Sequence, residues 1–496
     1  MQLYIDNKTE YLNNYYFQTL CLLYYPGEKF PAESDSPNKA VFSLWEENDV
    51  IFASVKLYAD GRESEGFFSA GCEIINGGTK ESAAEAVVGN AYLIAGKKLF
   101  GFLPPWGSLT GLRPVKRAGY YLSKGKDYNY VSDLFSKAYN VSNEKIKLSV
   151  EIAEKEAKLL EGRDENSCCL YIAIPFCPTR CAYCSFVSYS NAKLFKTIPD
   201  YLLRLKEDIV RTGNIIGEIG LKLTHLYIGG GTPTTLSAED LRGLLSHMES
   251  ALDYSSLAEF TVEAGRADCT TLEKLKVIKE FGVDRISINP QTTNDDVLKL
   301  IGRNHTAKQF FEAAENAFSL GFNSVNADLI AGLPGDTRES FEKSLSDVIS
   351  KGFDNITLHT LSVKNASPIR FDMDGVYDPQ GAQVRDNVAY AMNTLKASGY
   401  NPYYLYRQKN TVGNGENTGY AKEGKECLYN ILMMEEHSTV FACGASAITK
   451  LVSPDKSKIV RKAFPKYPFE YLAAPRGIGE ELIRDFYEEI RHDRNS

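Results

Sequence analysis

Several features are missing from this sequence, and each absence excludes a class of protein. No apolar run reaches the roughly 20 residues of a membrane-spanning helix, so we expect no membrane span. The first residues, MQLYIDNKTEYLN, lack the basic region and hydrophobic core of a signal peptide. The net charge is −8, so no excess of positive charge predicts a nucleic-acid partner. Together these absences predict a cytoplasmic protein.

Cysteine is also scarce, and its distribution is informative. Ten cysteines in 496 residues are too few for a disulfide scaffold. Three of them, Cys177, Cys181 and Cys184, stand at C-x3-C-x2-C spacing in YIAIPFCPTRCAYCSFVSY. Thiolates this close can converge on one soft metal centre, namely zinc, copper(I) or an iron–sulfur cluster.

The surroundings of these cysteines bear on which metal they bind. A structural zinc site takes a fourth ligand, and the stretch up to Lys193 offers neither Cys nor His. A 4Fe–4S cluster held by three cysteines leaves one iron open to chelate a small molecule. Zinc, and three unrelated buried cysteines, are the alternatives, since free cysteine is often buried.

The length predicts two or three domains. We expect a small α+β domain in residues 1–150. Aromatic and β-branched residues predict strands in 1–25, 39–60 and 64–71, and helical spacing predicts a helix over 81–102.

Two features follow within or next to this domain. The segment PPWGSLTGLRPVKRAGYYLSKG carries a basic patch, Arg113, Lys116 and Arg117. It can meet an acidic substrate or partner, or form a solvated turn. Residues 143–162 have the pattern of a solvated amphipathic linker helix.

From about Cys169 the chain alternates apolar runs with helical stretches, which is typical of a parallel sheet of βαβ units. The expected strands are CLYIAI, THLYIGG, EFTVEA, DRISIN, SVNADLI and NITLHT. They predict an α/β fold, a partial (β/α)6 TIM-like barrel over residues 165–365. Residues 366–496 are expected to cover the barrel.

Polar residues recur where the expected strands end, at the rim where such barrels place their active sites. The glycines before Thr232 can expose backbone N–H groups to an anion. Glu263 and Asp328 can accept hydrogen bonds from ribose hydroxyls or an ammonium group, and Gln291 can both donate and accept. Arg303, in LIGRNHT, can clamp a carboxylate or form a surface salt bridge. These groups suit a zwitterionic amino acid joined to a nucleoside.

The cysteine loop resembles the signature of radical S-adenosylmethionine (SAM) enzymes. With LYIGGGTPTTL, FTVEAG, DRISINPQ, LIGRNHT and ADLIAGLPGDT, residues 165–450 resemble the oxygen-independent coproporphyrinogen III oxidase family. The N-terminal extension with PPWGSLTGLRPVK is similar to its HemZ-like, coproporphyrinogen dehydrogenase branch. The resemblance implies a radical SAM barrel that binds a 4Fe–4S cluster and SAM.

The resemblance also implies roles for individual residues. Three cysteines would bind the cluster, namely Cys177, Cys181 and Cys184. Nine further residues would form the SAM pocket: Tyr171, Tyr183, Gly230, Gly231, Thr232, Glu263, Gln291, Arg303 and Asp328.

The implied reaction is the anaerobic oxidative decarboxylation of coproporphyrinogen III. A 5′-deoxyadenosyl radical removes a hydrogen from the β-carbon of a propionate side chain, and loss of carbon dioxide and one electron leaves a vinyl group. Two propionates become vinyls, which gives protoporphyrinogen IX in haem biosynthesis. The implied partners are a tetrapyrrole substrate and a low-potential electron donor such as flavodoxin or ferredoxin.

Two departures from the family keep alternatives open. The oxidases carry a further cysteine where this chain has Phe186, and a histidine where it has Ala173. A haem chaperone of the same family shares the missing cysteine, although its His-Asn-x-x-Tyr-Trp segment is not matched at residues 429–434. A radical SAM enzyme of tetrapyrrole breakdown is the third reading. Arg407 can face a substrate carboxylate at the barrel mouth, or lie on an exposed strand.

Overall fold

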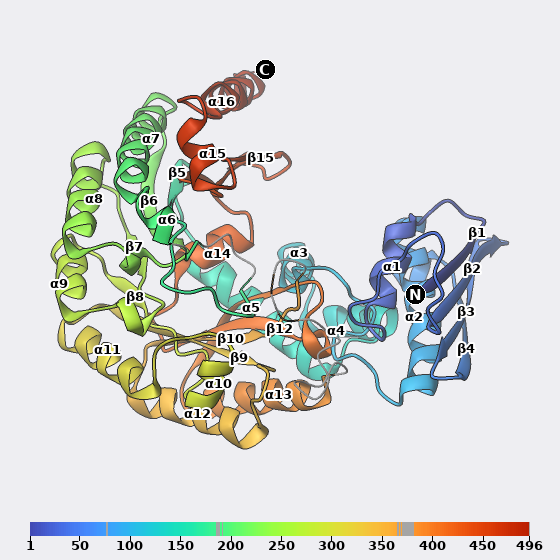
Figure 1. Cartoon of the computed structure of the whole chain (residues 1–496). Helices are drawn as coiled ribbons and strands as arrows, with labels where there is room; N and C mark the ends of the chain where they lie inside the picture. Colours follow the sequence, from blue (N-terminus) through green and yellow to red (C-terminus); the bar gives the residue numbers. More distant parts are fainter. Residues whose placement is uncertain are drawn as a thin grey trace.

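The computed structural model describes residues 1–75, 78–184, 189–190, 192–364, 367, 369 and 381–495. Its first unit is a four-stranded sheet in the order β1-β2-β3-β4, with β1 parallel to β2 and the other pairs antiparallel. The strands are β1 (Gln2–Asn7), β2 (Lys39–Glu47), β3 (Val50–Ala59) and β4 (Arg62–Ala70). Helix α2 (Lys80–Phe100) packs against β3 and β4. The unit lies to one side of the larger sheet (Figure 1).

The prediction of strands throughout residues 1–25 is wrong after β1. Residues Asn14–Cys21 form helix α1 instead. The side chain of Asn13 accepts a hydrogen bond from the Tyr16 backbone N–H, which caps the first turn. Phe17 and Leu20 are buried together, so the aromatic residues follow helical rather than alternating spacing.

Three helices connect this unit to the larger sheet: α3 (Pro114–Ser123), α4 (Tyr128–Tyr139) and α5 (Asn143–Leu159). The expectation of a solvated linker helix is wrong for α5. Ile146, Val150 and Ala153 are buried in the same hydrophobic core as the barrel strands. All three helices begin within residues 1–150, and all three contribute side chains to the core of the barrel.

The basic patch does not lie in a solvated turn. Lys116 and Arg117 are part of α3, and Arg113 precedes it. Arg113 Nη1 and Lys116 Nζ lie 2.7 and 2.9 Å from the buried carboxylate of Glu436. The Arg117 guanidinium lies 4.6 Å from the ring centre of Tyr139. The patch thus joins α3 to the C-terminal part of the chain.

The larger sheet confirms the predicted parallel barrel strands. Their order is β5-β6-β7-β8-β9-β10, and every neighbouring pair is parallel. The strands are β5 (Ser167–Ile174), β6 (Lys222–Gly230), β7 (Glu259–Glu263), β8 (Arg285–Ser287), β9 (Ser324–Ala331) and β10 (Asn355–Thr360).

Helices cover the outer face of this sheet (Figure 1). They are α6 (Ala192–Phe195), α7 (Ile198–Glu218), α8 (Ala238–Ala251), α9 (Leu272–Glu280), α10 (Asp295–Leu300), α11 (Ala307–Ser319), α12 (Arg338–Lys351) and α13 (Ala382–Ala397). Ser237, Thr271, Thr306 and Thr337 cap the helices that follow them. The result is the predicted partial (β/α)6 arrangement.

The C-terminal part of the chain extends this sheet at both edges. Strands β12 (Glu416–Ala421) and β11 (Asn401–Arg407) follow β10, and both pairs are antiparallel. At the other edge β13 (Thr439–Cys443) pairs with β5 in parallel, followed by β14 (Ile448–Val452) and β15 (Ile459–Ala463). Within the described residues the curved sheet thus has 11 strands.

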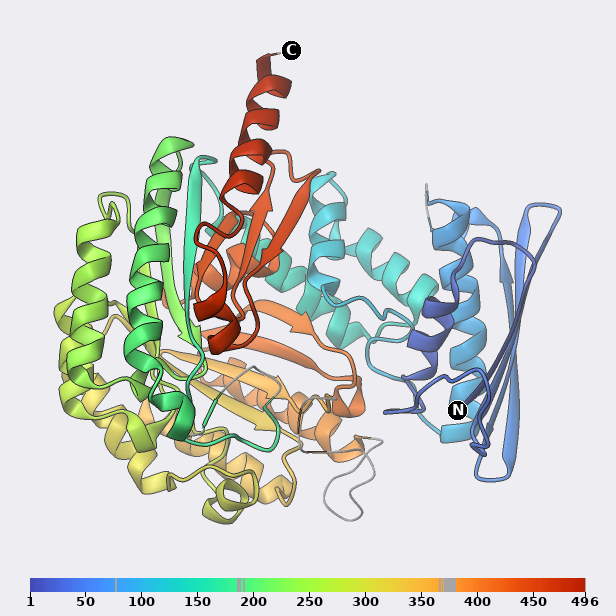
Figure 2. The same ribbon diagram turned by 45° about the horizontal axis from the view of Figure 1, so that its top comes forward.

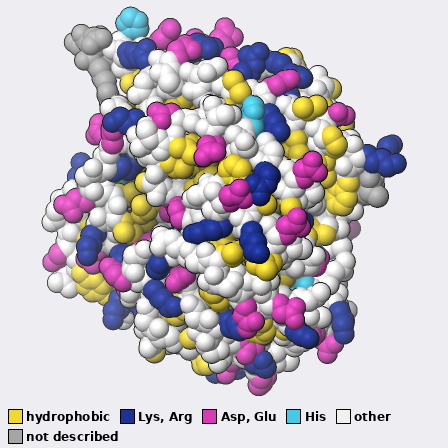
Figure 3. Space-filling model, turned by 90° about the vertical axis from the view of Figure 1, so that its left-hand side faces the viewer, with side chains coloured by type: hydrophobic (Ala, Val, Ile, Leu, Met, Phe, Trp, Pro, Cys, Tyr) yellow, Lys and Arg dark blue, Asp and Glu magenta, His cyan; other side chains and the backbone are white. Residues whose placement is uncertain are grey.

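Three helices complete the C-terminal part: α14 (Leu428–Met434), α15 (Pro468–Ala473) and α16 (Glu480–Asn495). Helix α14 lies within the curve of the sheet, and α16 extends from its edge (Figures 1 and 2). In the part of the chain that the structure describes, no helix is both long and apolar enough to span a membrane. Figure 3 shows acidic and basic side chains interspersed on one face.

Candidate active site

The three clustered cysteines lie in the loop after β5, at the carboxyl end of the sheet. Cys177 and Cys181 are buried, and Cys184 is half-buried. The loop is fixed from two sides: the Cys177 N–H donates to Tyr189 O at 3.0 Å, and the Ala182 N–H donates to Ile301 O at 2.9 Å. All three thiols are free of disulfides.

The thiols of Cys177 and Cys181 contact residues outside this loop. Within the described ranges, no group of three or more His, Cys, Asp or Glu side chains is arranged to hold a metal ion. Cys177 Sγ instead lies 3.4 Å from Thr232 Oγ1, and Cys181 Sγ accepts a hydrogen bond from Arg266 Nη1 at 3.3 Å. The assignment of the three cysteines as metal ligands therefore stays a prediction.

Arg266 is a site residue that the sequence analysis missed. Its guanidinium is buried and paired with Asp268 through contacts of 3.0 and 2.8 Å. It also donates to Thr179 Oγ1 at 2.8 Å and to Thr179 O at 3.3 Å, so it makes three hydrogen bonds to the cysteine loop. The sequence signal was an arginine directly after the Glu-Ala-Gly at the end of the third barrel strand. Arg266 therefore places a fixed positive charge beside the Cys181 thiol.

The glycine-rich turn after β6 packs against the cysteine loop. The Gly231 N–H donates to Ile174 O and the Thr232 N–H to Phe176 O, both at 2.8 Å. The Gly230 N–H is bonded to Glu263. The expectation that these N–H groups are exposed to an anion is therefore wrong, because the neighbouring strand, the cysteine loop and a carboxylate use them.

The same contact explains why glycine stands at position 231. A Cβ there would lie 2.6 Å from the backbone oxygen of Phe176, closer than real Cβ contacts. The turn thus positions the cysteine loop rather than presenting open donors.

Glu263, at the end of β7, faces a pair of stacked tyrosines. Its Oε1 accepts a hydrogen bond from the Tyr227 hydroxyl at 2.7 Å. The Tyr171 and Tyr227 rings stack with centres 6.0 Å apart. Burial raises the pKa of Glu263 to about 7; the negative charge of Asp328 adds to the rise and the Tyr227 hydrogen bond opposes it. Glu263 can therefore exchange a proton near neutral pH.

Gln291 and Asp328 meet through their backbones at the ends of β8 and β9. The Gln291 N–H donates to Asp328 O at 2.9 Å. Gln291 has φ of 67°, a left-handed conformation that non-glycine residues adopt rarely. Its buried Oε1 has no hydrogen-bond partner among the described residues. An orphaned acceptor held in a strained backbone is typical of a ligand site.

Asp328 is surrounded by donors. Asn326 Nδ2 donates to its Oδ1 at 2.8 Å, and His359 Nε2 lies 3.5 Å from its Oδ2. Burial alone would raise the pKa of Asp328, but the contacts with His359 and Asn326 hold it below its usual value. Asp328 is therefore ionised at neutral pH, in contrast to Glu263.

Arg303 is buried, which excludes the surface salt bridge considered from the sequence. It donates to the Tyr183 hydroxyl at 3.3 and 3.1 Å. Its Nη1 donates to Gly265 O at 3.0 Å and to Asn289 O at 2.7 Å. Arg303 thus ties Tyr183 of the cysteine loop to the ends of two strands, and no ion pair joins it to a carboxylate among the described residues.

Three other expectations concern the surroundings of this rim. Arg407 is buried and donates to Leu109 O and Asn414 O, so neither a barrel-mouth position nor an exposed strand is correct. Ala173 is buried on β5. Phe186 lies outside the described residues.

The comparisons with known proteins agree with this geometry. The family model of the Radical SAM superfamily matches residues 171–348, the segment from β5 into α12. The fold is also that of coproporphyrinogen III oxidase (HemN) from Escherichia coli, with a TM-score of 0.52 and 22% identity over 67% of this chain and 73% of that one. The protein is therefore a radical SAM protein.

Two curated relatives narrow the family. The chain is 36% identical over 463 residues to the oxygen-independent coproporphyrinogen-III oxidase-like protein HemZ of Bacillus subtilis, covering 92% of this chain and 90% of HemZ. It is 32% identical over 325 residues to the heme chaperone HemW of the same organism, covering 63% of this chain and 81% of HemW. The chain belongs to the family of oxygen-independent coproporphyrinogen-III oxidase-like radical SAM proteins, whose cofactors are a 4Fe–4S cluster and SAM.

Proposed function

We propose that the protein is a cytoplasmic radical SAM enzyme that converts coproporphyrinogen III to protoporphyrinogen IX without oxygen. The observation that carries this proposal is the meeting of Glu263, Gln291, Arg303 and Asp328 at one rim, beside the cysteine loop. The similarity to HemZ supports it, since that match covers 92% of this chain.

The residues present fit a 4Fe–4S cluster. In the proposal Cys177, Cys181 and Cys184 supply three thiolates, and Arg266 offsets their negative charge through its contact with Cys181. Backbone hydrogen bonds at Cys177 and Ala182 fix the loop that carries these thiols. The open fourth position would take SAM.

The rim also fits SAM. In the proposal the orphaned Gln291 Oε1 accepts a donor of SAM, and the ionised Asp328 accepts from a ribose hydroxyl or the ammonium group. Arg303 and Tyr183 orient the cysteine loop against this pocket. The remaining predicted contacts are Tyr171, Gly230, Gly231, Thr232 and Glu263, where the three turn residues would act through groups other than their backbone N–H. When bound, the reduced cluster and SAM supply the 5′-deoxyadenosyl radical that removes a hydrogen atom from each propionate.

The decisive experiment is an anaerobic assay of the cluster-reconstituted protein with SAM, coproporphyrinogen III and a low-potential reductant, such as reduced flavodoxin or ferredoxin. We expect 5′-deoxyadenosine together with one- and two-step losses of carbon dioxide, read by mass spectrometry. A Cys181→Ala variant is the matched control and should give neither product. If 5′-deoxyadenosine forms while the porphyrinogen stays intact, the oxidase proposal fails, and haem is the next substrate to test as a target of breakdown.

A haem carrier is the second candidate, because the match to the heme chaperone HemW covers 81% of that protein. It predicts stable, stoichiometric haem binding without consumption of the porphyrinogen. Absorption titration with haem, run beside the SAM-cleavage assay, distinguishes the two. Tight haem binding without decarboxylation favours the carrier, and decarboxylation without stable haem binding favours the oxidase.

A further inference from the structure

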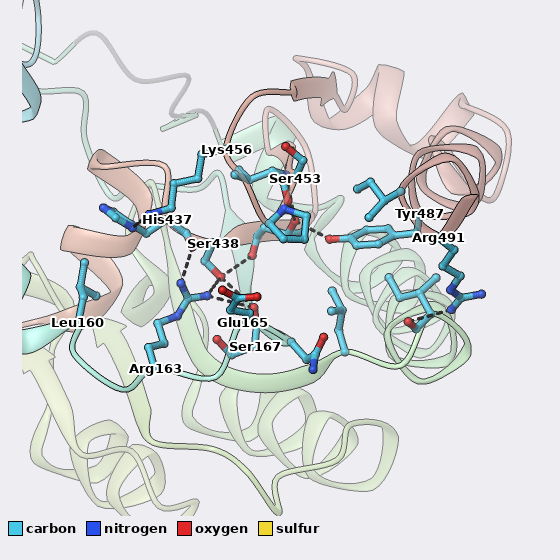
Figure 4. Close-up of a pocket in the computed structure, with 17 residues that line it drawn as sticks. Leu160, Arg163, Glu165, Ser167, His437, Ser438, Ser453, Lys456, Tyr487 and Arg491 are labelled. Carbon is cyan, nitrogen blue, oxygen red and sulfur yellow. Dashed lines mark hydrogen bonds between the residues drawn. The ribbon is translucent and has the colours of Figure 1, made fainter. Parts of the chain in front are cut away.

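A cavity lies at the opposite end of the barrel from the cysteine loop. It has a volume of about 340 Å³ and is formed where β5 and β13 begin, with the turn after β14 and helix α16 completing its wall (Figure 4). Strand β5 runs from Ser167 at this cavity to Ile174 at the cysteine loop. At about 3.3 Å per residue the two sites are separated by roughly 25 Å. The cavity is therefore no part of the rim described above.

Positive charge collects on the wall of this cavity. Arg163, Lys456 and Arg491 line it, against one carboxylate, Glu165. None of the three cations lies within the 4.0 Å ion-pair distance of a carboxylate in the described part of the chain. Figure 4 shows Arg163, His437 and Lys456 on one side of the cavity.

The protonation of these groups is consistent with unbalanced positive charge. Burial, then the charges of Lys456 and Arg163, lower the pKa of His437 to about 4. Burial, then the charges of Arg163 and Lys116, also lower the pKa of Lys456. His437 is thus neutral at pH 7 and its Nδ1 contacts Lys456 Nζ. An anion placed here would relieve the repulsion between the cations.

The floor of the cavity offers unused polar groups. Ser167 is 4% exposed, and its Oγ has no hydrogen-bond partner among the described residues. The same holds for the buried Nε of Arg163, whose Nη atoms bind His437 O, Ser167 O and Ser438 Oγ. Buried polar atoms rarely stay without a hydrogen bond, so Ser167 Oγ and Arg163 Nε indicate that a bound partner completes this cavity.

Apolar residues, among them Ile219, Val452 and Ile490, also line the cavity. A cavity of this size that combines convergent polar groups with apolar side chains is typical of small-molecule sites. Inorganic anions would satisfy only the polar groups. The combination favours a ligand with a charged head and an apolar body.

We propose that this cavity binds a small organic anion, with its carboxylate or phosphate group between Arg163 and Lys456 and its apolar body against the apolar lining residues. Such a ligand would contact β5, the turn after β14 and α16 together. It would therefore fasten the C-terminal helix to the barrel at a site remote from the proposed SAM pocket.

The test is calorimetric titration of the full-length protein at constant ionic strength. The probes are hexyl phosphate, hexanoate, inorganic phosphate and hexanol. We expect saturable 1:1 binding of hexyl phosphate or hexanoate, weaker binding of phosphate alone, and no binding of hexanol. Absence of saturable binding by both amphiphilic probes would overturn the proposal. The readout uses neither SAM nor substrate, so it is independent of the proposed reaction.

A matched pair of lysines locates the binding. Lys456→Met removes a cation of the cavity and should weaken hexyl phosphate or hexanoate binding about tenfold or more, the usual effect of losing a charged hydrogen bond. Lys458→Met removes a neighbouring cation that pairs with Glu489 and does not line the cavity, and should leave affinity unchanged. Lys456→Arg keeps the positive charge and should therefore retain the affinity of the parent protein. Equal losses in the two methionine variants would show non-specific attraction and refute the site.

Discussion

Glu435 and Glu436 are neighbours in sequence, and we predict that their ionisation changes the stability of the fold in opposite directions. Glu435 is 5% exposed and faces Glu156, which is 6% exposed; each has an Oε1 without a hydrogen-bond partner among the described residues. Burial raises the pKa of Glu435 to about 7 despite Arg113 and Lys116. The folded protein therefore holds a proton that the unfolded chain releases at a pKa near 4.5.

The sign and size of the effect follow from proton linkage. Because the folded state binds more protons, the free energy of unfolding falls as pH rises from about 4.5 to about 7. A pKa raised this far costs about 3 kcal/mol above pH 7. Glu435→Gln keeps the shape of the protonated acid and removes that cost. We expect the variant to be more stable than the parent by up to about 3 kcal/mol at pH 8, with most of the difference lost at pH 5.

Anaerobic urea denaturation at pH 5, 6.5 and 8 measures this difference. Glu436→Gln is the control from the next residue. Burial opposes its charge, but hydrogen bonds from Arg113 and Lys116 hold the pKa of Glu436 at about 2. Its ionised form therefore stabilises the fold above pH 4.5, and its removal should destabilise the protein at pH 8. If Glu435→Gln followed the same pH dependence as the parent, the buried carboxyl pair would not be protonated as argued.

Three further predictions concern the cysteine loop. Cys181→Ala should abolish iron binding on reconstitution, whereas Cys443→Ala, which changes a buried cysteine of β13, should retain it. Iron content per protein is the measurement, and retained iron in Cys181→Ala would contradict the ligand assignment. Arg266→Gln removes a positive charge 3.3 Å from Cys181 Sγ and should make the cluster harder to reduce; a redox titration followed by electron paramagnetic resonance would show an unchanged potential if this charge is irrelevant. Gly231→Ala places a Cβ 2.6 Å from a backbone oxygen and should lower both Tm and iron content, whereas Gly217→Ala, with no atom within 4 Å, should not.

The barrel was predictable because its signals are local. Each parallel strand is a short apolar run between helices with clear caps, and the cysteine spacing stands in one loop. The edges were not predictable in the same way. β13 pairs with β5 although more than 260 residues separate Cys168 from its partner Thr439, and no local pattern encodes such a partner.

The candidate site likewise has features that local sequence signals predict and features that only the structure shows. Glu263 and Asp328 were found because strand ends of a parallel sheet share one rim. Their different pKa values depend on neighbours from other elements, such as Tyr227 and His359, and follow only from the structure. Likewise the N–H groups of the glycine turn looked open in sequence, because their acceptors lie elsewhere in the chain: Ile174 and Phe176 come well before the turn, and Glu263 comes after it.

The interior of the barrel is formed by two parts of the chain, the superfamily segment and the C-terminal part. The superfamily model matches residues 171–348, which contain the cysteine loop and most of the rim. Tyrosines from beyond this segment reach the same interior: Tyr429 of α14 stacks on Tyr227 at 4.5 Å, and Tyr404 stacks on Tyr406 at 6.3 Å. Helix α14 is therefore a segment where differences in binding can arise, since residues 429–434 do not match the His-Asn-x-x-Tyr-Trp segment of the chaperones.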